Sequence, residues 1–182
     1  MRLETERLVL RTPRADDADD FFAVWGDETT TRFIGGPKTR DEVVAMIQRM
    51  DRHWERYGVG LFALERKEDG RALGRVGLLV WDPKRWVNGF RADVAEPLET
   101  EIGWTLGREH WGRGYATEAA LACRDWALGE LGLTRLISLI AHENVASIRV
   151  AEKLGESFER DVEPNPFRFP VGVWALGERM TA

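Results

Sequence analysis

The chain has 182 residues and a formal net charge of −5, from 26 basic and 31 acidic side chains. This length predicts a single domain, residues 1–182, with a core large enough to fold without disulfides or metal ions. A lone cysteine and three scattered histidines exclude an internal disulfide and argue against any metal site. No basic block indicates nucleic-acid binding, and no apolar stretch suits a signal peptide or a membrane span. We therefore expect a cytoplasmic protein without nucleic-acid or membrane partners.

The first half of the chain predicts strands and helices from its apolar periodicity and turn residues. The predicted elements are a strand at 6–12, helices at 16–25 and 39–57, and a hairpin of strands at 61–67 and 72–81. Thr39 to Glu42 form a capping-box pattern at the start of the second helix, and Gly58 ends that helix. A long polar connection at 82–99 follows, in which exposed rings of Trp86 and Phe90 would border an acceptor site or a dimer contact.

The second half predicts two strand–helix pairs and a final strand. These elements are a strand at 100–106, a helix at 114–130, a strand at 134–141, a helix at 144–154 and a strand at 171–176. The strand at 134–141 is almost continuously apolar, so both of its faces should be buried. Gly155 follows the last helix at a position where a left-handed glycine commonly ends a helix. This succession of elements is typical of an α+β protein with a mixed sheet.

A glycine-rich turn lies between the strand at 100–106 and the helix at 114–130. Gly112 and Gly114 let the backbone approach a ligand closely, and the free N–H groups at the helix start favour an anion such as a phosphate. The pattern is neither a P-loop, which needs Gly-Lys-Ser/Thr, nor a dinucleotide fingerprint, which needs a third glycine. A plain strand-to-helix turn is the alternative interpretation.

A second motif spans Asn144 to Gly155. As an alternative interpretation, Asn144 is simply the cap of a helix and Ser147 an ordinary residue of its first turn. Four segments in the right order carry a family resemblance: Arg7–Arg11, Glu101–Trp104, Trp111–Ala119 and Asn144–Gly155. With them the chain resembles the GNAT superfamily of acetyl-CoA-dependent N-acetyltransferases over nearly its whole length. It is most similar to the Rim-type branch, which includes ribosomal-protein N-terminal acetyltransferases.

The resemblance implies an α+β fold with a mixed, mostly antiparallel central sheet flanked by helices. Its fourth and fifth strands should splay apart so that the pantetheine arm of acetyl-CoA inserts between them, with the pyrophosphate on the glycine turn. Carried over residue by residue, the cofactor-binding set is Trp104, Thr105, Leu106, His110, Trp111, Gly112, Arg113, Gly114, Tyr115, Ala116, Asn144 and Ser147. Two residues depart from the family pattern. Glu109, where glutamine or arginine is usual, is expected to point outward, and Glu156 stands where phenylalanine is usual.

The implied reaction is attack of a neutral amine on the acetyl thioester, which a base and an acid would assist. We expect Glu101 to be the base, directly or through a water molecule, with Glu99 on the same strand face in reserve. Ser147 is the candidate acid, near the thioester sulfur or the cofactor. The alternatives are a hydrogen-bonded strand carboxylate for Glu101 and a helix-capping hydroxyl for Ser147. Arg113 either contacts phosphate or faces solvent.

The resemblance implies transfer of an acetyl group to a primary amine, and a protein or peptide N-terminus is the first expectation for the acceptor. The alternatives are a small-molecule amine, such as an antibiotic, a polyamine or an amino-acid analogue, and a non-catalytic acyl-CoA sensor. Acceptor loops vary within one fold, so the residues leave the acceptor and the acyl length open. We expect a monomer or homodimer, with Cys123 in the core and His53 and His142 at the surface.

Overall fold

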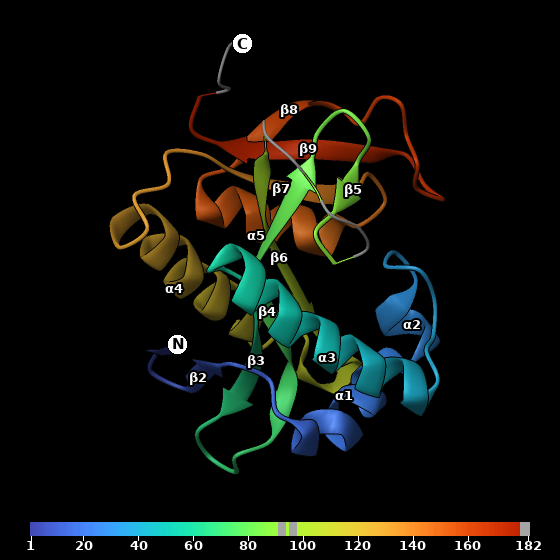
Figure 1. Cartoon of the computed structure of the whole chain (residues 1–182), viewed down its shortest axis with the longest axis vertical. Coiled ribbons are helices and arrows are strands. Elements are labelled where there is room, and N and C mark those ends of the chain that lie inside the picture. Colours follow the sequence, from blue (N-terminus) through green and yellow to red (C-terminus); the bar gives the residue numbers. More distant parts are fainter. Residues whose placement is uncertain (91–93, 95–97, 179–182) are drawn as a thin grey trace.

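The computed structural model describes residues 1–90, 94 and 98–178. Within this part the strands join one sheet in the order β1-β2-β3-β4-β6-β7-β9-β8, with β5 added to β4 (Figure 1). The strands are β1 (Arg2–Glu4), β2 (Leu8–Arg11), β3 (Leu61–Arg66), β4 (Ala72–Asp82), β5 (Val87–Asn88), β6 (Glu99–Leu106), β7 (Leu136–Ala141), β8 (Ser157–Asp161) and β9 (Val171–Leu176). β6 and β7 run parallel and the other neighbours antiparallel, which confirms the predicted α+β class with a mixed, mostly antiparallel sheet.

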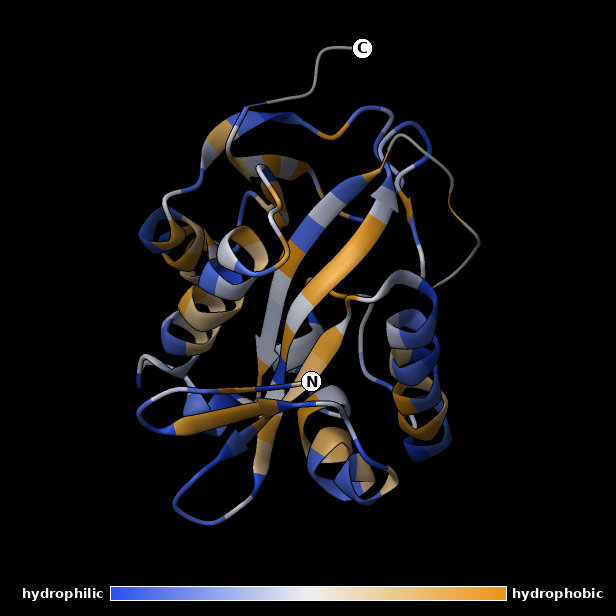
Figure 2. Ribbon diagram, turned by 60° about the vertical axis from the view of Figure 1, so that its left-hand side comes forward, coloured by the Kyte–Doolittle hydropathy of each residue, from blue (hydrophilic) through white to orange (hydrophobic). Residues whose placement is uncertain are grey.

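Helices cover both faces of this sheet (Figure 1). They are α1 (Ala18–Trp25), α2 (Glu28–Thr31), α3 (Arg40–Tyr57), α4 (Tyr115–Gly129) and α5 (Val145–Leu154), with short 3-10 turns at Ala15–Asp17 and Arg108–His110. One apolar cluster joins α1 and α3 to Leu79 and Trp81 of β4, and a second joins α4 to Val76 and Leu78. Because side chains alternate along a strand, the two clusters lie on opposite faces. In Figure 2 one long central strand is mostly apolar, the strand beside it carries polar and apolar bands, and the helices also carry both.

α3 begins and ends where its sequence signals predict. The Thr39 hydroxyl accepts from the Glu42 N–H, and the Glu42 carboxylate accepts from the Thr39 N–H at 2.7 Å, which completes the capping box. Gly58 ends the helix in the left-handed conformation, at φ 67°. His53, one turn earlier, is buried, and its Nδ1 lies 2.8 Å from the Val59 carbonyl oxygen. The prediction of a surface position for His53 is therefore wrong, because this face of α3 packs on the sheet.

β6 and β7 part at a fork, which confirms the predicted splay of the fourth and fifth strands. β6 pairs with β4 along its whole length but with β7 at a single position, Glu101 opposite Ile137. β7 pairs over its whole length with β9 instead. At the fork, the Ser138 hydroxyl donates to the Ile102 carbonyl oxygen at 2.8 Å, so a side chain satisfies a carbonyl that the interrupted ladder leaves free.

The sequence prediction omits four short elements, namely β1, α2, β5 and β8. β8 is an edge strand with mostly exposed side chains, so its sequence lacks the apolar alternation of a half-buried strand. Cys123 is fully buried and His142 is exposed, as predicted. In the described part of the chain, no helix combines the length and apolar character that a bilayer crossing needs.

The connection at 82–99 differs from its interpretation. Trp86 is buried, with its ring centroid 6.5 Å from that of Trp81, so it is not an exposed aromatic. Phe90 is half-buried and stacks on His53. Residues 91–93 and 95–97 of this connection lie outside the described residues. Asn88 reaches the cavity described below, so this segment does border the candidate site.

Candidate active site

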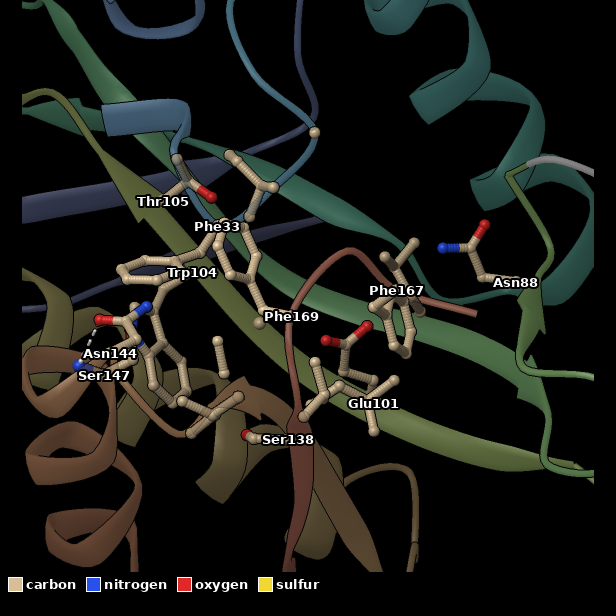
Figure 3. A pocket seen from close by; sticks show the side chains of 18 of the residues that line it. Phe33, Asn88, Glu101, Trp104, Thr105, Ser138, Asn144, Ser147, Phe167 and Phe169 are labelled. Atoms are coloured by element: carbon tan, nitrogen blue, oxygen red, sulfur yellow. Dashed lines mark hydrogen bonds between the residues drawn. The ribbon is translucent and has the colours of Figure 1, made fainter. Parts of the chain in front are cut away.

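The fork between β6 and β7 opens into a cavity of about 380 Å³ (Figure 3). Its walls come chiefly from β4, β6 and β7, from the α2–α3 connection at 32–36, from the start of α5 and from the β8–β9 connection at 166–169. Phe33, Trp81, Phe167 and Phe169 supply aromatic walls, with Phe33 packed edge-on against Phe169 and Trp81 against Phe167. A concave site of this size that combines aromatic walls with converging polar groups is typical of small-molecule binding.

Glu101 lies at the fork, on the residue of β6 that still pairs with β7. Its Oε2 accepts from the Trp81 indole N–H at 2.6 Å, and the Leu139 backbone N–H also donates to the carboxylate. Burial raises the pKa of Glu101, while these two bonds and the charge of Arg75 oppose the rise. A carboxyl group with a raised pKa in a cavity is suited to act as a general base near neutral pH.

Glu99, the reserve candidate for the base, has other partners. Its carboxylate pairs with the Arg135 guanidinium at 3.0 Å, and Arg135 also pairs with Glu159 at 2.9 Å. Glu99 is not among the described residues that line the cavity. β6 therefore presents Glu101, and not Glu99, to the cavity.

Asn144 and Ser147 meet at the start of α5. The Asn144 Oδ1 accepts from the Ser147 N–H at 3.2 Å, so Asn144 is the cap of this helix, and both side chains also line the cavity beside Trp104 (Figure 3). Asn144 and Ser147 follow the end of β7, whereas Glu101 pairs opposite Ile137, near the start of β7. The two predicted catalytic residues, Glu101 and Ser147, thus lie at the fork and at the open end of the splay, about 13 Å of strand apart.

The hydroxyl group beside the fork is that of Ser138, which sequence reasoning missed. Ser138 is buried, lines the cavity and lies 3.1 Å from the Glu156 Oε1 in addition to its bond to Ile102. Glu156 is the residue that departs from the family pattern after α5, and its Oε2 is buried without a hydrogen-bond partner. One signal was available, because Ser138 is the only polar residue within the otherwise apolar β7.

The glycine turn has the open backbone that its sequence predicts. Gly112 and Gly114 have φ values of 72° and 81°, in the left-handed region that favours glycine. A Cβ at Gly112 would meet no heavy atom within 4 Å, and one at Gly114 would meet only the Arg7 guanidinium at 3.4 Å. No side chain caps α4, whose first N–H groups follow this turn. The side chains of Arg113 and Glu109 are exposed, and Glu109 thus points outward as expected.

Several predicted cofactor residues turn their side chains away from the cavity. Leu106, Tyr115 and Ala116 pack in the apolar cluster under α4, so only their backbone is left to face a ligand. The Trp111 indole N–H donates to the Leu106 carbonyl oxygen at 2.7 Å, and its ring is half exposed. Burial lowers the pKa of His110, which contacts the neighbouring Glu109 and does not line the cavity. Thr105 and Trp104 do line it.

Arg7 ties the start of the chain to the glycine turn. Its guanidinium donates to the Arg113 carbonyl oxygen at 3.0 Å and to the Glu118 carboxylate at 2.7 Å, and it covers the Tyr115 ring at 4.5 Å. The Glu118 carboxylate also accepts from the Thr5 hydroxyl at 2.5 Å. These contacts fix the turn in front of α4 across more than a hundred residues of sequence, a separation at which local patterns carry no information.

Two further polar side chains of the cavity have no hydrogen-bond or ion-pair partner among the described residues. The Nε of Arg75 on β4 and the Oδ1 of Asn88 on β5 are both buried and unpaired. Arg75 is the only charged residue of β4 before its terminal aspartate, between Gly74 and Val76, and that isolation was a signal available in the sequence.

Comparison with known proteins places these features in a family. The family described as "Acetyltransferase (GNAT) domain" matches residues 7–157. The chain is 32% identical to the protein YkkB of Bacillus subtilis, over 95% of this chain and 94% of that protein. It is 31% identical to the N-acetyltransferase p20 of Bacillus licheniformis, over 87% of this chain and 83% of that protein. Among solved structures, a ribosomal L7/L12 alpha-N-protein acetyltransferase in complex with coenzyme A shares the fold, with a TM-score of 0.77 and 13% identity over 97% of each chain.

Proposed function

The chain belongs to the GNAT family of N-acetyltransferases, and on that premise we propose that it acetylates the α-amine of a peptide or protein N-terminus. Acetyl-CoA supplies the acetyl group: the acetyl carbon forms a bond to the amine nitrogen, the carbon–sulfur bond breaks and the CoA thiol leaves. The observation that carries the proposal is Glu101, a carboxylate held by Trp81 in the cavity where two strands part. This placement supports a base beside the reacting amine.

The chain's own residues fit acetyl-CoA at the open end of the splay. The left-handed glycines leave space beside the backbone, and the uncapped start of α4 offers N–H groups to the pyrophosphate. Trp104, Asn144 and Ser147 lie where the pantetheine arm would pass into the splay. In this proposal Ser147 contacts the arm. Its predicted role as the acid would require the thioester to lie close to the open end rather than at the fork.

Glu101 would accept the proton that the amine loses. At pH 7, deprotonating a lysine-like amine of pKa about 10.4 costs about 4.6 kcal/mol, whereas an α-amine of pKa about 8 costs about 1.4 kcal/mol. Because burial raises the pKa of Glu101, this carboxylate is a stronger base than an exposed one. One such carboxylate is ample for an α-amine. The departing thiolate, of pKa about 8.5, needs at most about 2 kcal/mol of help from an acid.

Two acceptor classes have support. The shared fold with the ribosomal L7/L12 alpha-N-protein acetyltransferase supports a protein N-terminus. The cavity volume of about 380 Å³ favours, as a second candidate, a free small-molecule amine, because it falls in the range of small-molecule pockets. Both acceptors would place their amine at Glu101.

The test is release of CoA thiol with a panel of peptides, amino acids, polyamines and aminoglycosides. We expect acceptor-dependent release, with saturation by peptides at the lowest concentration. Glu101→Gln should lower kcat by about a hundredfold or more, the usual share of a general base, and by more for lysine-like acceptors than for α-amines. Glu99→Gln is the matched control, because Glu99 does not line the cavity. Tight acetyl-CoA binding without turnover of any acceptor would instead favour the alternative of a non-catalytic acyl-CoA sensor.

A further inference from the structure

The cavity carries a net positive charge inside an acidic protein. Its charged lining residues, among those described, are Arg32, Arg75, Arg168 and Glu101. The chain as a whole has a net charge of −5, so this arginine excess is local to the cavity. A site that bound only a cationic amine would be expected to show the opposite balance.

The three arginines differ in what already neutralises them. Arg32 pairs with Glu143 at 2.8 Å on the exposed rim, and Arg168 is exposed beside the Phe169 ring. Arg75 is half-buried, its Nε is buried without a hydrogen-bond partner, and no ion pair to its guanidinium is found among the described residues; the guanidinium lies 5.6 Å from the centroid of the Trp25 ring and is within reach of the charge of Glu101. Burial lowers the pKa of Arg75 to about 10, and Glu101 opposes that shift. A partly desolvated guanidinium without a paired anion is a ready site for an anionic ligand.

Arg75 lies on the face of the sheet that α1 covers, opposite to the face that α4 covers. Its guanidinium lies over Trp25 of α1, whereas the glycine turn leads into α4, which covers the other face. No residue of the glycine turn lines the cavity, so the cofactor's phosphates would sit away from Arg75. The anion that Arg75 would meet is therefore part of the acceptor.

Arg75 and Glu101 share one face of the sheet. Leu79, opposite Glu101 in the β4–β6 register, lies four residues beyond Arg75 on β4, about 13 Å along the strand. Both side chains line the same cavity, and each charge acts on the pKa of the other. Between them the cavity has room for a molecule of amino-acid size. The unpaired Oδ1 of Asn88 offers a further hydrogen-bond acceptor to the amine of such a molecule.

We infer that the acceptor is an amine that also carries a carboxylate, with the amine held at Glu101 and the carboxylate bound by Arg75. This inference rests on the proposed acetyl transfer to an amine in the same cavity, and it narrows the acceptor class. A guanidinium offers two parallel N–H donors that match the two oxygens of a carboxylate. The carboxylate has two possible sources, a free amino acid or an acidic residue at the start of a peptide.

The experiment compares matched acceptor pairs that differ only in the carboxylate. Free amino acids are paired with their carboxamides, and peptides that begin with glutamate or aspartate with those that begin with glutamine or asparagine. We expect the wild-type kcat/KM to favour one carboxylate series by at least tenfold, which also identifies the source. Arg75→Gln should reduce that ratio to about threefold or less, and Arg75→Lys should retain part of it. Arg32→Gln, at an arginine already paired with Glu143, should leave the ratio intact.

Equal kcat/KM for the carboxylate and amide series in the wild type, or a preference that survives Arg75→Gln, would overturn the inference. A separate measurement keeps this outcome apart from failure of the proposed function. Calorimetric titration of glutarate into the acetyl-CoA-bound protein needs no turnover, and we expect binding at least tenfold weaker in Arg75→Gln. Equal glutarate binding by both proteins, or none by the wild type, would count against the carboxylate site. Glutarate binding lost with Arg75 but no acetylation of any amine would refute the proposed function alone.

Discussion

Glu156, buried beside the fork of the sheet, should make the stability of the protein fall as the pH rises. The Ser138 hydroxyl has one hydrogen, which it donates to the Ile102 carbonyl oxygen at 2.8 Å. A protonated Glu156 can donate to Ser138 across their 3.1 Å contact, whereas an ionised one leaves a buried charge with an unpaired oxygen. Burial raises the pKa of Glu156 to about 8, and the nearby charge of Glu101 adds to this rise.

The sign and size of the effect follow from linkage between protonation and folding. The folded state holds the proton up to about pH 8, while the unfolded state, with an ordinary pKa of 4.5, loses it earlier. Below pH 4.5 both states are protonated and Glu156 costs nothing. Between pH 4.5 and about pH 8 the loss in the free energy of unfolding grows by 1.36 kcal/mol per pH unit, to about 2 kcal/mol at pH 6 and about 4 kcal/mol at pH 8. Above pH 8 the cost is constant.

The perturbation is Glu156→Gln, which keeps the shape and removes the titration. Urea unfolding at pH 6 and pH 8 should show the variant gaining about 2 kcal/mol on the wild type between the two values. Glu152→Gln, at an exposed glutamate of the same segment, is the matched control and should show no such gain. If the stability difference between Glu156→Gln and the wild type were the same at both pH values, the reasoning about a protonated Glu156 would be wrong.

Two further predictions concern the cofactor turn and the base. Gly112→Val should weaken acetyl-CoA binding at least tenfold in a calorimetric titration, because a side chain would strain a left-handed residue and enter the open space of the turn. Gly58→Val is the control, since Gly58 is equally left-handed but ends α3, and it should leave acetyl-CoA binding unchanged. Unchanged acetyl-CoA affinity in a folded Gly112→Val would remove the turn from the site. Trp81→Phe removes the indole donor that lowers the pKa of Glu101, so the acidic limb of the kcat/KM profile should move to higher pH. An unmoved limb would mean that Glu101 is not the titrating base.

The local signals of the sequence were sufficient wherever neighbouring residues decide the outcome. The capping box at Thr39, the left-handed Gly58 and Gly155, and the glycine turn before α4 are interactions within a few residues, and the structure contains each of them. The apolar β7 was recognised for the same reason, because burial of both faces leaves a continuous apolar run. The order of the elements and the four motifs were enough to indicate the family.

The environment of individual side chains depended on segments far away in the chain. His53 looked like a surface residue and is buried because α3 packs on the sheet, and Trp86 is covered by packing beside Trp81. Glu99 and Glu101 were equivalent by strand alternation. In the structure, Glu99 forms an ion pair with Arg135, whereas Glu101 lines the cavity. No local pattern separates two such carboxylates, since their partners lie 20 to 36 residues away.

The sequence by itself therefore determined the fold class, the family and the turn that suits a cofactor, because these depend on periodicity and on contiguous motifs. Only the tertiary structure decided which polar groups meet at the fork between β6 and β7. Ser138 and Glu156 lie beside this interrupted strand pairing and Arg75 lines the cavity into which it opens, and the Glu156 Oε2 and the Arg75 Nε are buried without hydrogen-bond partners. The physical reason is that desolvation and pairing depend on the distance between side chains in space, and strand pairing brings together residues that the chain holds far apart.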